Sequence, residues 1–493
     1  MLSSHPEHFD VLVIGAGLSG IGAAYHLQTL CPTRSYAILE GRGAIGGTWD
    51  LFRYPGVRSD SDMFTLGYRF RPWKSGRAIA DGPSIKAYIE DTAADFGIDE
   101  KIRFRHRLTR AEWSSAAARW LVVAEVGPDR TPVRYTCNFL YACTGYYDYA
   151  SGYTPEFPGR DRFRGAIVHP QSWPERLDYE GKRVVVIGSG ATAITLVPAM
   201  AEKAGHVTML QRSPTYVAAL PARDAIAEAL RRVVPARAAY AATRWKNVLR
   251  GMFYYELARR RPALTRRLVR EAALRALGPG YDVDTHFNPR YEPWDERFCV
   301  APDGDFFRAV REGRASVVTD RIDAFTETGI RLSSGTHLDA DIIVTATGLN
   351  AKLLGGVTLV VDGAPVDLAR RIAYKGMMYS DVPNPASAVG YTNASWTLKC
   401  DLVAEHVCRL LNRMRARGED VVTPRVRGAS MQTLPLIDLK SGYVQRAVAS
   451  IPRQGTRAPW RLYQNYVKDL LLLRFGRVIE DELELARAPA QSV

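Results

Sequence analysis

Two glycine-rich turns constrain the fold of this 493-residue chain most strongly. In each, a short apolar run typical of a strand precedes the turn, and a run rich in Ala and other apolar residues, typical of a helix, follows it. The first turn contains Gly15, Gly17 and Gly20, and the second contains Gly188, Ser189, Gly190, Ala191, Thr192 and Ala193. A strand, such a turn and a helix together place a pyrophosphate at the helix N-terminus. The sequence therefore predicts two Rossmann-like dinucleotide-binding folds.

The two folds differ in the residue that ends their next strand-like segment. After the first turn this segment ends in Glu40, where an acid accepts hydrogen bonds from ribose hydroxyls. After the second turn it ends in Gln211-Arg212-Ser213, without an acid. A carboxylate there would repel a 2′-phosphate, whereas the Arg212 guanidinium can bind it through two hydrogen bonds. The first fold therefore suits an adenine dinucleotide with a free ribose, and the second suits NADPH.

The order of the segments predicts that the second fold is inserted in the first. The segments 138–145 and 340–348 both resemble buried strands that end in Thr-Gly, as expected where the chain crosses between two domains. We predict an α/β protein with a discontinuous first domain over 1–150 and 341–493. The second domain covers 160–340 and contains a helical insertion at about 222–290.

Composition and charge exclude several classes of protein. The hydrophobic content of 46% and charged content of 24% are typical of a soluble globular chain. No secretory leader, membrane-spanning run or C-x-x-C pair is recognised, and we predict a cytoplasmic protein without a metal site. The net charge is +14, of which the window 223–275 supplies +10. That window indicates either solvated helix faces or peripheral contact with an anionic membrane at its inner face, and no nucleic-acid module accompanies it.

The bridge between the two turns carries a third motif, "FRGAIVHPQSWPE" over 163–175. Its spacing F-x-G-x-x-x-H-x-x-x-W-P comprises Phe163, Gly165, His169, Trp173 and Pro174. This arrangement, with one dinucleotide fingerprint on each side of the motif, resembles the sequence signature of the type I Baeyer–Villiger monooxygenases. These are flavoproteins that use NADPH and O₂. The similarity covers nearly the whole chain, including "GGTWDLFRYPGVRSDSDM" and "YTNASWTLK". A flavin disulfide reductase is disfavoured because no cysteine pair follows the first fold.

The resemblance implies FAD in the first fold and NADPH in the second. In this family a peroxyflavin inserts oxygen next to a ketone carbonyl to give an ester or lactone, and it also oxidises sulfur in sulfides and thioamides. The expected partners are O₂ and an apolar ketone or sulfur-containing small molecule. The alternatives are a flavin monooxygenase that oxidises mainly sulfur or nitrogen, a wasteful NADPH oxidase, and a basic lipid-surface protein. The physiological substrate and the oligomeric state stay open.

The resemblance also assigns roles to residues. Arg297 is the expected catalytic cation, and Asp60 would orient and partly neutralise it. The implied FAD contacts are Ser19, Glu40, Thr48, Trp49, Asp50, Leu51, Asp60 and Leu108. The implied NADP contacts are Arg58, Ser59, Asp60, Gly188, Ser189, Gly190, Ala191, Thr192, Ala193, Ile194, Arg212 and Ser213. We interpret His169 as a hydrogen-bonded anchor of the domain linker, which Trp173 packs and Pro174 stiffens, rather than as a general base. A packing histidine without functional coupling is the alternative.

Overall fold

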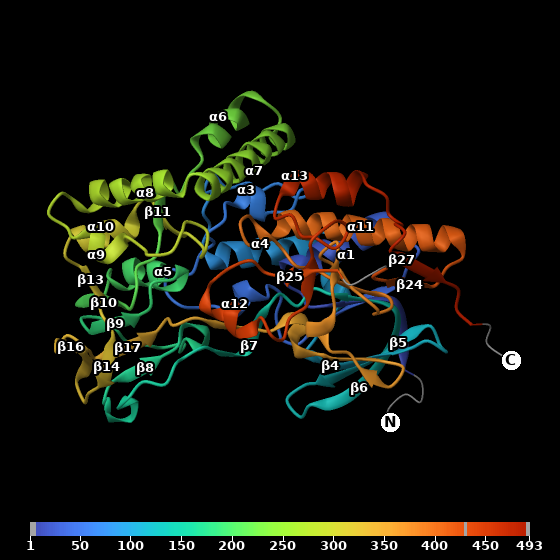
Figure 1. The fold of residues 1–493 in the computed structure, drawn as a ribbon, viewed down its shortest axis with the longest axis horizontal. Coiled ribbons are helices and arrows are strands. Elements are labelled where there is room, and N and C mark those ends of the chain that lie inside the picture. The colour runs from blue at the N-terminus through green and yellow to red at the C-terminus, as the bar shows by residue number, and fades with distance from the viewer. Residues whose placement is uncertain (1–5, 428–430, 490–493) are drawn as a thin grey trace.

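Two separate sheets organise the computed structural model, which describes residues 6–427 and 431–489 (Figure 1). In each sheet, one strand leads through the predicted glycine turn into the predicted helix. In chain order, the strands of the second sheet fall between those of the first. The prediction of an α/β fold with two Rossmann-like units, one inserted in the other, is confirmed.

The first sheet has a parallel half and an antiparallel half. Its strands follow the order β20-β19-β4-β5-β6-β1-β2-β3, and β23 pairs with the end of β6. The strands are β1 (Glu7–Ile14), β2 (Tyr36–Glu40), β3 (Ile102–Phe104), β4 (His106–Ser114), β5 (Arg119–Val126), β6 (Thr131–Ala142), β19 (Thr358–Val361), β20 (Ala364–Pro365) and β23 (Pro385–Ser387). Residues 11–14 of β1 are buried because helices cover one face and the β4–β5 meander the other.

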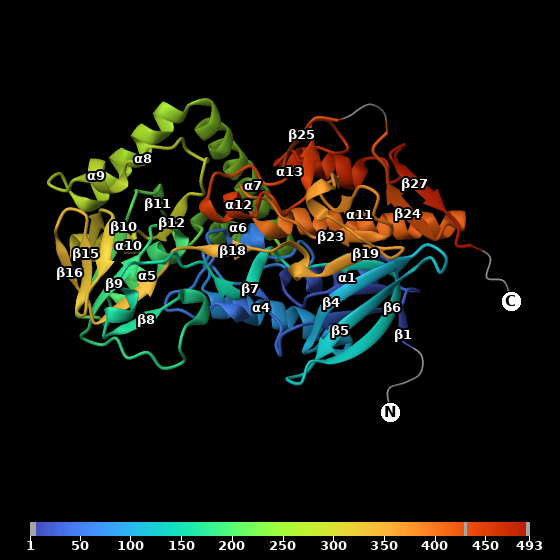
Figure 2. The same ribbon diagram turned by 60° about the horizontal axis from the view of Figure 1, so that its bottom comes forward.

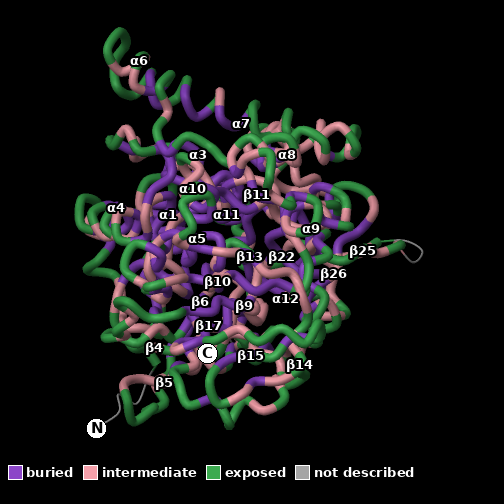
Figure 3. Tube along the Cα trace, turned by 90° about the vertical axis from the view of Figure 1, so that its left-hand side faces the viewer, coloured by how far each residue is buried: buried purple, intermediate pink, exposed green. Residues whose placement is uncertain are grey.

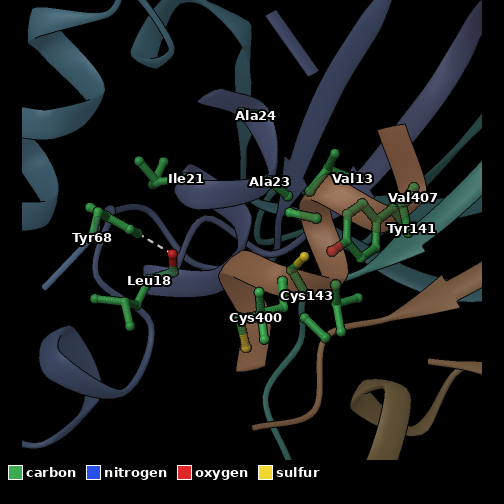
Figure 4. Packing of buried hydrophobic residues seen from close by; sticks show 14 of the residues in the cluster. Val13, Leu18, Ile21, Ala23, Ala24, Tyr68, Tyr141, Cys143, Cys400 and Val407 are labelled. Atoms are coloured by element: carbon green, nitrogen blue, oxygen red, sulfur yellow. Dashed lines mark hydrogen bonds between the residues drawn. The ribbon is translucent and has the colours of Figure 1, made fainter. Parts of the chain in front are cut away.

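Helix α1 (Leu18–Leu30) is buried along much of its length, between the first sheet and α11 (Trp396–Arg417). Its small residues Ala23 and Ala24 let neighbouring elements approach closely, as Figure 4 shows around Tyr141, Cys143 and Cys400. The Tyr68 hydroxyl donates a 2.6 Å hydrogen bond to the Leu18 carbonyl at the helix start. This packing fixes the N-terminal end of α1, where the first turn lies.

The second sheet is entirely parallel, in the order β13-β10-β9-β17-β8. Its strands are β8 (Ala166–Val168), β9 (Arg183–Ile187), β10 (His206–Gln211), β13 (Ala315–Thr319) and β17 (Ile342–Thr345), and α5 (Ala191–Met200) and α10 (Asp305–Arg311) pack on it. Because β17 pairs with β8 and β9, the chain leaves the second sheet after Thr345. The predicted return at 341 is therefore a few residues too early.

A helical segment separates β10 from β13. It contains α6 (Ala225–Val233), α7 (Ala236–Arg260), α8 (Pro262–Leu277) and α9 (Val283–Phe287), flanked by the strand pair β11 (Val217–Leu220) and β12 (Cys299–Pro302). In Figure 1 it lies across the top of the molecule, with α6 standing out from the rest. None of the helices in the described ranges is long and apolar enough to cross a bilayer.

The remaining elements lie outside these two sheets and the helical segment. They include α2 (Thr48–Leu51), α3 (Met63–Leu66), α4 (Gly82–Asp95), α12 (Gly442–Ala447), α13 (Tyr466–Asp469), β7 (Tyr147–Gly152), β14 (Ile322–Phe325), β15 (Gly329–Leu332), β16 (His337–Asp339), β18 (Leu349–Ala351), β21 (Ala373–Tyr374), β22 (Met378–Tyr379), β24 (Val421–Pro424), β25 (Thr433–Pro435), β26 (Arg453–Gly455) and β27 (Leu483–Ala486). Strands β7 and β18 pair antiparallel between the two sheets (Figure 2), so the outgoing and returning crossovers lie side by side.

Candidate functional site

A cavity of about 600 Å³ extends from the first glycine turn to the start of α5. The predicted residues that line it are Gly15, Gly17, Ser19, Glu40, Thr48, Trp49, Arg58, Ser59, Asp60, Leu108, Ala191, Thr192 and Arg297. The predicted residues outside its lining are Gly20, Asp50, Leu51, Gly188, Ser189, Gly190, Ala193, Ile194, Arg212 and Ser213. The cavity therefore joins the first site to the start of α5 and to the predicted catalytic cation.

The first turn leaves room for a pyrophosphate because side chains are absent where the backbone is most crowded. Gly15 has a φ of +102°, and a Cβ there would lie 2.7 Å from the Cys143 carbonyl oxygen. A Cβ on Gly20 would lie 1.8 Å from the Gly15 carbonyl oxygen. Gly17 precedes α1, whose start has no side-chain cap, so its first N–H groups are free to bind an anion.

Glu40 ends β2 as a buried carboxylate at the edge of the cavity. Its Oε2 accepts a hydrogen bond from the Ala16 N–H and its Oε1 accepts one from the Arg42 N–H, both at 2.7 Å. Burial raises the pKa of Glu40, and these two N–H groups oppose the rise. Each carboxylate oxygen has a second lone pair, so Glu40 keeps acceptor capacity for ribose hydroxyls.

Asp50 supports the loop beside the first turn and lies outside the cavity lining. Its buried carboxylate forms salt bridges with Arg42 at 2.6 Å, Lys86 at 2.9 Å and Arg53 at 3.2 Å. Burial alone would raise the pKa of Asp50, but the Arg42 and Lys86 charges hold it below its usual value. The side chain therefore fixes α2, so that Thr48 and Trp49 of the same helix line the cavity.

Arg297 brings a positive charge to the inner end of the cavity. Among the described residues it forms no salt bridge and no hydrogen bond within the chain, so its guanidinium is available to an anion. Burial alone would lower the pKa of Arg297, but the hydroxyls of Tyr146 and Tyr147 and the Asp60 carboxylate raise it above its usual value. Burial also raises the pKa of Asp60, and Arg297 opposes that rise. The predicted pair is thus brought together electrostatically without direct contact.

Two tyrosines that the sequence did not single out for this site, together with Trp396 of the "YTNASWTLK" segment, also line the cavity. The Tyr146 and Tyr147 hydroxyls lie 2.8 Å apart, and the Tyr146 ring stacks on Trp396 with centroids 5.1 Å apart. The Trp396 Nε1–H donates a 2.9 Å hydrogen bond to the Ser19 hydroxyl. The signal available was "TGYYDY": side chains that follow the Thr-Gly after β6 lie at the sheet edge where ligands bind.

Arg58 joins the two sheets by an ion pair. Its guanidinium bonds both carboxylate oxygens of Asp305 on α10, and Nη2 also donates to the Val300 carbonyl at 3.4 Å. Its buried Nε has no hydrogen-bond partner in the part of the chain that the structure describes. Arg58 lines the cavity, as expected for a residue near NADP, but most of its donors are already engaged.

The second turn has the same backbone as the first in a more open setting. Gly188 has a φ of +129°, and a Cβ there would lie 2.3 Å from the Ala346 carbonyl oxygen, whereas a Cβ on Gly190 would meet nothing within 4 Å. The Ser189 hydroxyl donates to the Ser213 carbonyl at 3.1 Å. Arg212 is exposed and forms no ion pair with the described residues. This donor set fits the 2′-phosphate of NADPH.

The linker motif packs against both crossovers. The His169 ring lies directly over Gly152, where a Cβ would be 1.9 Å from Cε1. His169 Nε2 lies 3.2 Å from the Gly348 carbonyl, to which it donates, and Nδ1 accepts from the Gln171 N–H at 3.1 Å. One imidazole therefore bridges the outgoing chain at Gly152 and the returning chain at Gly348.

The other members of the motif have packing roles. Phe163 is buried beside the second sheet, and a Cβ on Gly165 would lie 2.6 Å from its ring. Trp173 packs on the second core as a partly buried side chain, whereas Pro174 is exposed. These contacts agree with the interpretation of the motif as a linker anchor.

A cavity that runs from one dinucleotide turn to the helix of the other and is lined by a half-buried cation defines a class of protein, and comparison with known families specifies it. The family described as flavin-binding monooxygenase-like matches residues 80–225, and an NAD(P)-binding Rossmann-like domain matches residues 13–74. The FAD-containing monooxygenase EthA of Mycobacterium tuberculosis is 55% identical over 98% of this chain and 99% of its own. EthA of Mycolicibacterium smegmatis is 54% identical over 98% of both chains.

Solved structures of related monooxygenases share the fold. An oxidised steroid monooxygenase bound to NADP matches with a TM-score of 0.76 and 23% identity, over 97% of this chain and all of the other. OTEMO in complex with FAD and NADP matches with a TM-score of 0.73 and 20% identity, over 98% of this chain and all of the other.

The chain belongs to the family of FAD-containing monooxygenases. The predicted class of enzyme, a flavin monooxygenase that contains FAD, is thereby confirmed. The roles of individual residues stay predictions.

Proposed function

We propose that this monooxygenase inserts an oxygen atom next to the carbonyl of an apolar ketone, to give an ester or lactone, and also oxidises sulfur in sulfides and thioamides. The observation that carries the proposal is the Arg297 guanidinium, which lines the cavity and has no anionic partner in contact among the described residues. Bound FAD and NADPH supply the reduction and activation of O₂. Addition of oxygen to a ketone places negative charge on the carbonyl oxygen, which a fixed cation stabilises.

The residues around Arg297 support this role. Burial raises the pKa of Tyr146 and Tyr147, so both hydroxyls are neutral and can donate hydrogen bonds to an oxyanion. Asp60 reduces the cost of burying the guanidinium without blocking it by a contact ion pair. Because the cavity is lined by the first dinucleotide fold and by α5 of the second, closure of the two parts would exclude water from the reacting groups.

The second candidate is an enzyme that oxidises mainly sulfur or nitrogen. Transfer of oxygen to a sulfide builds no oxyanion on a carbonyl, so it depends less on Arg297. A panel of apolar ketones and thioethers, assayed with the purified enzyme for ester and sulfoxide, separates the two. We expect both products; a wild-type enzyme that makes sulfoxide alone would contradict the proposal and favour this alternative.

Substitution of Arg297 sharpens the test. We expect Arg297→Met to reduce the kcat for ketones by about 100-fold or more, as for loss of an oxyanion donor, with a smaller loss for thioethers. Arg290→Met, which changes an exposed arginine outside the cavity, is the matched control. Equal losses on both substrate classes, with FAD retained, would argue against an oxyanion role.

A further inference from the structure

The hairpin formed by α6 and α7 exposes an unusual number of large apolar side chains. These are Ile226 and Val233 on α6, Val234 in the turn, and Trp245, Leu249, Phe253 and Tyr254 on α7. Val233 is 76% exposed and Phe253 is 62% exposed. Figure 3 shows α6 and much of α7 in green, at the edge of the molecule. A cluster of this kind on a soluble chain marks an interaction surface.

The exposed side chains form one face of α7 because Trp245, Leu249 and Phe253 are spaced by four residues. The opposite face is fixed to the first sheet's part of the molecule. There the Tyr240 hydroxyl donates to the Tyr68 carbonyl at 2.9 Å, and the Arg244 guanidinium donates to the Gly67 carbonyl at 2.7 Å. The apolar face of α7 therefore cannot turn inward.

Positive charge without partners surrounds this face. Arg232, Arg237, Arg250 and Arg261 are exposed and form no ion pair within the described part of the chain. Other arginines of the segment are paired, for example Arg260 with Glu256 at 3.0 Å. The cations that stay unpaired are thus interleaved with the exposed apolar residues.

A second element extends the surface. Trp245 on α7 packs edge-on against Tyr466 of α13, with ring centroids 5.7 Å apart. The helical turn Leu470–Phe475 follows α13 directly and exposes Leu471 and Phe475. Figure 1 shows α13 beside the end of α7. Two segments far apart in sequence thus expose apolar residues on neighbouring elements.

We propose that this surface, comprising the exposed residues of α6 and α7 with Leu471 and Phe475, docks on an anionic lipid bilayer. Apolar and Trp side chains enter the interfacial region while unpaired arginines contact lipid phosphates. A second copy of this chain is a poorer occupant, because two segments that each carry a large positive excess would repel one another. The proposal is independent of the proposed oxygen chemistry.

Docking would bring the enzyme to where apolar substrates concentrate. The buried face of α7 contacts residues 64–67, which follow Asp60 of the cavity within one short segment. The docking surface and the active cavity are therefore joined through one helix.

Flotation of the FAD-loaded full-length enzyme with vesicles tests the proposal. Vesicles of phosphatidylcholine with phosphatidylglycerol are compared with phosphatidylcholine alone at physiological salt. We expect the enzyme to float with the anionic vesicles only. The Arg232→Gln/Arg237→Gln/Arg250→Gln/Arg261→Gln variant should bind at least about tenfold more weakly, since each surface arginine contributes appreciably to anionic binding. Leu249→Ser/Phe253→Ser should also lose binding.

The control removes equal charge elsewhere, through Arg110→Gln/Arg134→Gln/Arg331→Gln/Arg370→Gln, all at exposed positions outside the helical segment. FAD content and NADPH oxidation in detergent-free buffer check that each variant is folded. The proposal is overturned if the wild type does not float with anionic vesicles, or if the control loses binding as much as the α6–α7 variant. A wild-type dimer that Phe253→Ser dissociates, with no flotation, would assign the surface to a second copy instead.

Discussion

The two glycine turns share one backbone geometry but differ in how far the rest of the chain encloses them. Gly15 and Gly188 both have positive φ, and Gly17 and Gly190 both precede a helix that has no side-chain cap. The first turn is covered: a Cβ on Gly17 would lie 3.5 Å from the Gly47 Cα. The second is open, since a Cβ on Gly190 would meet nothing within 4 Å.

The strand tips follow the same division. Glu40 is buried and bonded to two backbone N–H groups, whereas Arg212 is exposed and has no ion pair among the described residues. The same turn therefore serves two purposes according to its surroundings. An enclosed turn suits a cofactor that stays bound, and an open one suits a coenzyme that binds and leaves.

The largest expected effect is at the enclosed site. Glu40→Ala removes the ribose acceptor and leaves the Ala16 and Arg42 N–H groups without their partner, at about 1–3 kcal/mol each. We expect FAD binding to weaken by about 100-fold or more, with NADP⁺ binding nearly unchanged. Flavin absorbance after desalting measures the FAD that stays bound, and a titration with NADP⁺ measures the affinity for NADP⁺. A variant that retains FAD as tightly as the wild type would break the comparison.

The next effect is at the open site. Arg212→Ala removes the cation proposed for the 2′-phosphate, and loss of one charge-assisted contact costs about 1.5–3 kcal/mol. We expect the KM for NADPH to rise about 10–100-fold while the KM for NADH and the FAD content are unaffected. Steady-state oxidation of NADPH and of NADH by the variant and the wild type gives the change in each KM. If the KM for NADPH and NADH rise together, Arg212 does not read the 2′-phosphate.

The smallest effect concerns the hinge between the sites. His169→Ala removes the bridge between the two crossovers, and we expect the amount of product formed per NADPH consumed to fall at pH 8, because the hinge positions the two parts during turnover. FAD content should stay unchanged, and Phe163→Leu, a buried change in the same motif, controls for packing alone. Unchanged coupling in His169→Ala would leave His169 as a packing residue.

The pH dependence of this effect has a definite sign. Burial lowers the pKa of His169 below its ordinary value of about 6.5, although the bonds to the Gly348 and Tyr153 carbonyls oppose the shift. Neutral His169 accepts from the Gln171 N–H, and a protonated ring cannot. Its contribution is therefore present above about pH 6.5 and lost as pH falls through the lower folded value. In acid, the amount of product that the wild type forms per NADPH consumed should fall toward the value of His169→Ala. The value of the variant itself should not change with pH.

Sequence patterns predicted the fold because the glycine turns and the strand tips are local. Gly15, Gly188 and Glu40 act through backbone conformation and position in a strand, which neighbouring residues determine. The predicted start of the return to the first domain was a few residues too early. The segments 138–145 and 340–348 have similar sequences, and only the pairing of β17 with β8 and β9 shows that residues 342–345 still belong to the second sheet.

Contacts between distant segments could not be predicted in this way. Tyr146 and Trp396 stack across 250 residues of sequence, and Arg58 pairs with Asp305 on helix α10 of the second fold. Asp50 shows the same limit, because its motif placed it near FAD, whereas its own carboxylate is outside the cavity lining and forms ion pairs with three cations. Tertiary packing determines which distant residues become partners, and local sequence patterns carry no information about that packing.

The difference in enclosure between the two turns is tested most directly by how well the wild-type enzyme retains each dinucleotide. The purified protein is loaded with FAD and NADP⁺ and passed through a desalting column, and the bound nucleotides are then quantified. We expect about one FAD per chain to be retained and NADP⁺ to be largely lost, as enclosed and open turns require. Loss of FAD with retention of NADP⁺, or equal loss of both, would contradict the account.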